Sequence, residues 1–148
     1  MTDWIDDWVA RLDDAQRNDN LRSWNQLQHE RLIAKHDLQV FSQLSGEMER
    51  QVEELRQRLG ATLGKIEYQR TDSSATVHFA GFTMEAKFVP RRGIVIESAA
   101  PAWEGQRRDV SFEADVSTGN VLMAINGKRV SATELVSTVL EEGARRAV

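Results

Sequence analysis

The three histidines are the residues best suited to acid–base or metal chemistry, but their spacing does not bring them together. His29 and His36 are seven positions apart in a segment of helical periodicity, which separates them by about 10 Å along a helix axis. At that distance the pair cannot share one metal ion without ligands from elsewhere. His78 falls on the predicted polar side of a hairpin, directly across from Thr83. We therefore expect surface histidines rather than a catalytic or metal site.

Sequence motifs of catalytic and cofactor sites are absent. The chain contains no nucleophile elbow, zinc-protease helix, P-loop or dinucleotide-binding glycine pattern. It has no cysteine, which excludes disulfides, thiol catalysis and cysteine-based zinc or iron–sulfur sites. The oxygen-rich cluster around Asp13, Asp14 and Asp19 lacks the alternating spacing of a calcium loop. The sequence therefore predicts neither an enzyme nor a bound cofactor or metal.

Pairs of adjacent basic residues could instead bind an anion. If the turns that carry them gather at one end of a sheet, they would form a basic rim suited to nucleic acid. Acidic residues interleave with the pairs, and only Trp103 is available nearby to stack on a base, so solvated turn residues are the competing interpretation. The candidate contact residues are Arg91, Arg92, Arg107, Arg108, Lys128 and Arg129, and a fourth pair is Arg145 and Arg146.

Tryptophans near the N-terminus favour a different function, which is contact with another protein. Trp4, Trp8 and Leu12 fall on one face of a helix predicted from Thr2 to about Arg17, with aspartates on the opposite face. Tryptophan is enriched in interface hot spots, and this spacing is typical of a helix that docks in a hydrophobic groove. The alternative is that this face packs on the next helix of its own chain.

The N-terminal segment is also the acidic part of the chain. Six aspartates and two arginines in the first twenty residues account for the whole formal net charge of −4. Such a segment repels nucleic acid and anionic lipid, and aspartates in a first turn stabilise a helix through its dipole. An inhibitor or immunity-type protein that acts through this acidic helix is therefore one functional hypothesis.

A second, longer helix is predicted from about Leu21 to Leu59. A turn at Asn18–Asn20 would separate it from the first helix, and a straight continuation is the alternative. The segment has no proline and a single glycine, Gly46, and a heptad that starts at Trp24 gives a largely apolar seam. The seam consists of Trp24, Leu27, Arg31, Ala34, Leu38, Phe41, Ser45, Met48, Val52, Leu55 and Leu59.

The length of this helix suggests self-association. It would measure roughly 58 Å, whereas a compact chain of this size has a diameter of about 38 Å. An exposed apolar seam needs a cover, and a second copy could supply it as a coiled coil. The alternative is that Gly46 breaks the helix into two that pack within one chain. The predicted interface residues are Trp4, Trp8, Trp24, Leu38, Phe41, Met48, Val52 and Leu55.

After residue 60 the apolar residues alternate, which predicts an antiparallel β-meander of five or six strands. The most specific part is a hairpin around the two-residue loop Ala80-Gly81. A helix opened by a capping box at Ser131 and Glu134 closes the chain, and Gly143 is expected to end it. The predicted hairpin register opposes Phe79 with Phe82, Val77 with Met84 and Ala75 with Ala86, all on the buried face.

These patterns predict an α+β fold in two parts, a helical coiled-coil arm over residues 1–60 and an antiparallel sheet with a C-terminal helix over residues 61–148. No apolar run is long enough to span a membrane, and no signal pattern opens the chain, so we expect a cytoplasmic protein. The favoured function is a non-catalytic interaction or adaptor module that forms a homodimer and binds a further protein. The alternatives are an accessory nucleic-acid-binding protein and the acidic inhibitor.

Overall fold

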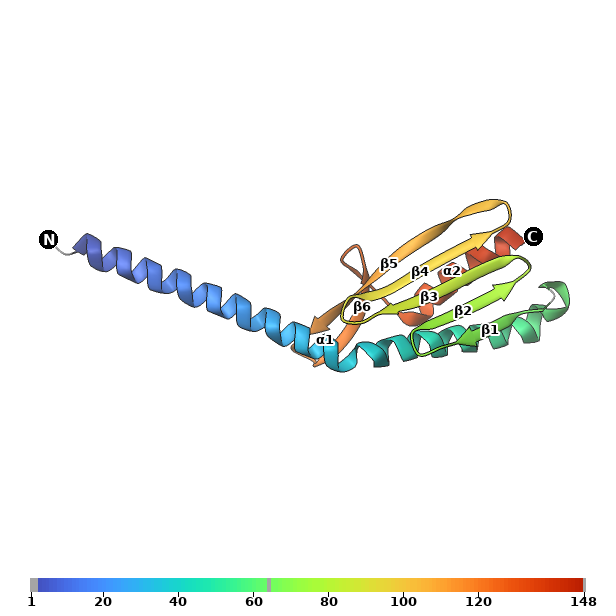
Figure 1. The fold of residues 1–148 in the computed structure, drawn as a ribbon, viewed down its shortest axis with the longest axis horizontal. Coiled ribbons are helices and arrows are strands. Elements are labelled where there is room, and N and C mark those ends of the chain that lie inside the picture. Colours follow the sequence, from blue (N-terminus) through green and yellow to red (C-terminus); the bar gives the residue numbers. More distant parts are fainter. Residues whose placement is uncertain (1–2, 64, 148) are drawn as a thin grey trace.

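The first element of the fold is one uninterrupted helix. In the computed structural model, which describes residues 3–63 and 65–147, α1 runs from Asp3 to Leu63 and contains 61 residues, or roughly 90 Å. The expected turn at Asn18–Asn20 does not form, because those residues stay helical. Figure 1 shows the N-terminal part of α1 projecting far from the body formed by the rest of the chain. The expected helix start at Thr2 lies outside the described residues.

The sheet is an antiparallel meander of seven strands in which every strand pairs with its neighbour in sequence. The meander is confirmed, with seven strands instead of five or six. The last strand was missed because it has only three residues, of which one is apolar. The strands are β1 (Glu67–Arg70), β2 (Ser74–Phe79), β3 (Phe82–Val89), β4 (Gly93–Ala100), β5 (Trp103–Asp115), β6 (Asn120–Ile125) and β7 (Lys128–Val130).

The predicted β2–β3 hairpin is confirmed in its register. Phe79 pairs with Phe82, Val77 with Met84 and Ala75 with Ala86, and all six side chains are fully buried. On the opposite face, His78 Nδ1 and Thr83 Oγ1 lie 2.9 Å apart, as cross-strand neighbours should.

One face of the sheet packs against two helices, and no helix of the described residues covers the other (Figure 1). The C-terminal part of α1 and the closing helix α2 (Ala132–Ala147) lie side by side on the covered face. Gly46 does not break α1, and it lies in open space. Val40, Phe41, Leu44 and Met48 of α1 share one core with the inward side chains of the sheet. Residues 40–55 of α1 are therefore part of the same packed body as the sheet.

The closing helix follows its sequence pattern except at its end. The Ser131 hydroxyl accepts a hydrogen bond from the Glu134 amide at 3.1 Å, as a capping serine does. Gly143 does not end the helix, and a Cβ atom there would lie 2.5 Å from the Phe82 ring. A glycine fits at this position because the helix and the sheet approach closely. The sequence pattern alone does not distinguish such a glycine from one that ends a helix. The apolar face consists of Leu135, Val136, Val139 and Leu140, all buried.

Polar contacts fix the place where α1 meets the sheet. Asp37 is buried; its Oδ2 accepts a hydrogen bond from the Arg91 amide in the β3–β4 turn at 2.8 Å. Further along, the Tyr68 hydroxyl donates to the Ser45 carbonyl at 2.9 Å. We call residues 3–36, which precede this attachment, the arm. None of the described helices is long and apolar enough to cross a membrane.

Candidate protein-interaction surface

The arm exposes large apolar side chains that nothing in the described chain covers. Trp4, Trp8 and Trp24 are 69%, 58% and 57% exposed. Such exposure is unusual for tryptophan, which is highly buried on average in globular proteins. With one exception, Val116, every exposed large apolar residue of the described chain lies on α1: Trp4, Ile5, Trp8, Val9, Leu12, Leu21, Trp24, Leu27 and Leu38.

These side chains form two stripes along the helix. At about 100° per residue, Trp4, Trp8 and Leu12 share one side of the arm. Leu21 and Trp24 belong to a second stripe that is rotated from the first by roughly half a turn. A strict heptad seam would keep one line along the whole helix, so the arm offers two apolar surfaces on opposite sides instead of one continuous seam.

The predicted interface residues divide after Leu38. Trp4, Trp8, Trp24 and Leu38 are exposed, as an interface requires. The inclusion of Phe41, Met48 and Val52 was wrong, because all three are fully buried against the sheet of their own chain. Leu55 is half-buried against the same core. The heptad pattern could not separate the two sets, because a helix seated on a sheet and one paired with another helix use the same spacing.

The arm carries opposite charges at its two ends. Its first half contains Asp3, Asp6, Asp7, Asp13, Asp14 and Asp19 against two arginines. Arg22, Arg31 and Lys35 lie in its second half, against Glu30. Of these side chains only Glu30 has a side-chain hydrogen bond within the described chain, from Gln26 at 3.3 Å. The arm is therefore acidic at its tip and basic near its base.

A pocket of about 530 Å³ lies at the corner between the base of the arm and the β3–β4 turn. Arg91 reaches it from that turn with a backbone φ of 66°, held by the bond to Asp37. We call this the junction pocket. Sequence reasoning missed it because Arg91 is far from the arm in the chain. It is lined by Leu27, Glu30, Arg31, Ile33, Ala34 and Arg91.

The basic pairs do not form one rim. Arg107 and Arg108 are adjacent in β5 and point to opposite faces of the sheet, as alternate strand residues must. Arg107 pairs with Asp109 at 3.1 Å, and Arg108 pairs with Glu142 of α2 at 2.7 Å. In the last turn of α2, the Arg146 guanidinium lies 4.0 Å from the centre of the Trp103 ring. Arg107, Arg108 and Arg146 are thus each paired with an acidic or aromatic side chain of the same chain.

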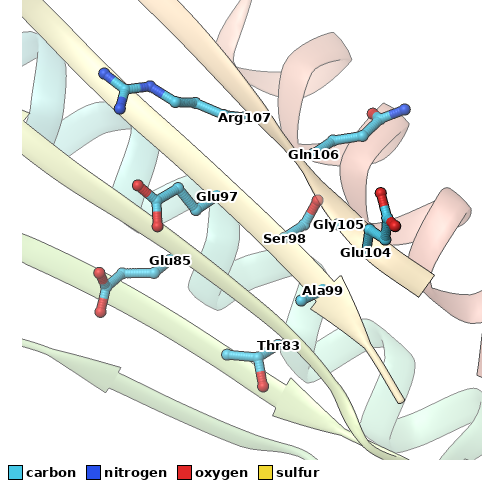
Figure 2. A pocket seen from close by; sticks show the side chains of 9 residues that line it. All are labelled: Thr83, Glu85, Glu97, Ser98, Ala99, Glu104, Gly105, Gln106 and Arg107. Carbon is cyan, nitrogen blue, oxygen red and sulfur yellow. The ribbon is translucent and has the colours of Figure 1, made fainter. Parts of the chain in front are cut away.

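The uncovered face of the sheet has an open hollow of about 490 Å³. Figure 2 shows Glu85, Glu97 and Arg107 side by side on β3, β4 and β5. Lys87 lies 3.1 Å from Glu85 and 3.9 Å from Glu97, and this pairing with Glu85 raises the pKa of Lys87. The carboxylates are therefore partly neutralised on an open surface, and no nucleophile with an adjacent base lines the hollow.

The histidines remain apart in the structure. His78 bonds only to Thr83 among the described side chains, and no group of three or more histidine or acidic side chains within residues 3–63 and 65–147 could hold a metal ion. Comparisons of the chain with protein-family models, curated proteins and solved structures found no match. The exposed apolar arm is thus the feature of the described chain with the clearest physical need for a partner.

Proposed function

We propose that this protein is a non-catalytic interaction module that self-associates through its arm. The observation that supports the proposal is the set of exposed tryptophans and leucines on the arm that no other part of the described chain covers. Most helical stability in proteins comes from packing an apolar face. Asn18, Asp19 and Asn20 in the middle of the arm are weak helix formers, so a partner that covers the apolar stripes would stabilise the arm.

The area available is sufficient for a stable dimer. A buried tryptophan contributes about 150–250 Å², and two copies would bring Trp4 and Trp8 twice, or roughly 600–1,000 Å². The exposed leucines bring the total into the usual range of about 1,200–2,000 Å² for specific interfaces. A symmetric pair in which both copies use the same surface also closes the assembly at two chains.

The molar mass in solution tests the proposal. Light scattering after gel filtration should give twice 16.8 kDa for the wild-type protein at tens of micromolar. Leu12→Glu combined with Leu27→Glu should give the monomer mass, because both side chains are exposed in the single chain and two carboxylates would be buried in the interface. Val116→Glu is the matched control, since Val116 is 50% exposed but lies outside the arm. A wild-type monomer would refute self-association.

The inhibitor hypothesis remains a second candidate because the acidic tip of the arm is exposed together with Trp4 and Trp8. It predicts a monomer that binds a basic protein surface, with an affinity that falls steeply as salt is added. The dispersed and neighbour-paired arginines give the nucleic-acid hypothesis less support. A monomeric wild-type protein would therefore favour the inhibitor.

A further inference from the structure

The junction pocket and the tip of the arm have complementary chemistry. The pocket has apolar walls from Leu27, Ile33 and Ala34, and its charged side chains are two arginines, Arg31 and Arg91, and one carboxylate, Glu30. The tip has Trp4 and Trp8 one helical turn apart, with Asp7 and Arg11 beside them, in a segment whose net charge is negative. The two sites cannot meet within one chain, because both lie on a single straight stretch of helix roughly 40 Å apart. A second copy of the chain can bring them together.

We propose that two copies associate antiparallel, so that residues 4–12 of each arm lie in the junction pocket of the other copy. This inference rests on the proposed self-association and specifies its geometry. The contact occurs twice in the dimer, once at each end of the paired arms, and the weak helix-forming segment Asn18–Asn20 lies near the symmetry axis. The two sheets then lie at opposite ends of the assembly.

Charge favours this orientation over the parallel one. The first twenty residues carry a net charge of −4, so parallel arms would place two such segments side by side. Like charges this close repel one another at moderate salt. In the antiparallel arrangement, each acidic tip lies instead beside Arg31 and Arg91 of the other copy. Complementary potentials of this kind fix the register and orientation of an interface.

The shape of the helix agrees with the same arrangement. At about 100° per residue, the stripe of Trp4, Trp8 and Leu12 faces the same side of α1 as Glu30 and Ile33, which line the pocket. A partner helix laid along this side therefore meets apolar residues at both ends. Ile5 of one copy then lies opposite Ala34 of the other, and Leu12 lies opposite Leu27.

Cysteine cross-linking tests the orientation, and the absence of native cysteine makes it unambiguous. A disulfide forms only when the two Cα atoms approach to about 4.4–6.8 Å. Chains with Ile5→Cys are mixed with mass-tagged chains with Ala34→Cys under conditions in which the protein is dimeric, and then oxidised. We expect a mixed disulfide in the mixture and none from either variant alone above the background of Val116→Cys.

Each other result has a distinct meaning. Self-coupling of Ile5→Cys alone would show parallel arms and overturn the antiparallel proposal while keeping self-association. A dimer in which Ile5→Cys does not couple to Ala34→Cys and Leu12→Cys does not couple to Leu27→Cys would overturn it as well. A wild-type monomer by light scattering would refute the proposed function itself.

A charge reversal tests the pocket independently of cross-linking. Arg31→Glu places a carboxylate beside the acidic tip of the partner, and we expect the dimer dissociation constant to rise roughly tenfold at low salt. Lys35→Glu makes the same charge change on the side of the arm opposite Trp4, Trp8 and Leu12, at a residue that does not line the pocket, and is the matched control. Equal effects of the two substitutions would show that the pocket has no special role and would contradict the proposal.

Discussion

Replacing Phe41 and Trp24 separately by alanine tests where the packed body ends and the arm begins. Both residues belong to the same apolar seam in the sequence, but Phe41 is fully buried and Trp24 is 57% exposed. Phe41 contacts the Phe88 ring with a centroid distance of 5.4 Å, and Phe88 in turn lies 6.1 Å from Phe112. Phe41 thus joins α1 to an aromatic row on the sheet.

The expected effects differ in size. Phe41→Ala removes a buried ring and leaves a cavity, which typically costs about 3–5 kcal/mol. For a domain of this size that loss lowers Tm by roughly 10–20 °C. Trp24→Ala removes no intrachain packing, so the free energy of unfolding of the monomer should change by less than about 0.5 kcal/mol.

Thermal and urea denaturation followed by circular dichroism measure both effects. Protein concentration must be varied, because a dimer gains stability with concentration. At the lowest concentration, equal losses for the two variants would show that the arm packs within its own chain. A negligible loss for Phe41→Ala would show that α1 does not rest on the sheet.

Two further predictions concern the anchoring of α1. Asp37→Ala leaves the Arg91 amide without its acceptor and should destabilise the fold by about 1–3 kcal/mol in urea denaturation. Asp37→Asn keeps an acceptor oxygen and should lose less stability. An unchanged urea midpoint for Asp37→Ala would contradict the contact. Tyr68 is the only tyrosine, and burial raises its pKa above the ordinary value of 10.0, so its ultraviolet titration should have a higher midpoint in folded than in denatured protein. Because the pKa of Tyr68 is raised in the folded protein, its contribution to stability is full below the unfolded pKa and is lost as pH rises through the folded pKa. Tyr68→Phe should lose this pH dependence of stability. Equal titration midpoints in folded and denatured protein would contradict the burial of Tyr68.

Patterns with a single physical explanation predicted the structure well. The β2–β3 register followed because a shift of one residue would have moved all six apolar side chains to solvent. The buried face of α2 followed from its helical spacing. Both patterns depend on neighbours within one hairpin or one helix, so they are readable from a short stretch of sequence.

The features that depend on distant residues could not be predicted. The seam residues Phe41 and Trp24 have the same spacing, and only the position of the sheet decides which is buried. Gly143 resembled a helix end, but Phe82 of a distant strand explains it. The junction pocket combines the arm with Arg91, and nothing in either segment alone indicates that they meet. Asp37 lies on a helix face with apolar residues such as Ile33 and Phe41, which indicates that it needs a polar partner if buried but does not indicate which one.

The two outermost strands restrict how copies of this protein can aggregate. An exposed strand edge is a template onto which a strand of another molecule can add. The outermost strands β1 and β7 are short, with four and three residues. They carry charged side chains such as Glu67, Arg70 and Lys128. An incoming strand would gain few hydrogen bonds at β1 or β7 and would meet charge, so the addition of a further strand at either of these two edges is disfavoured.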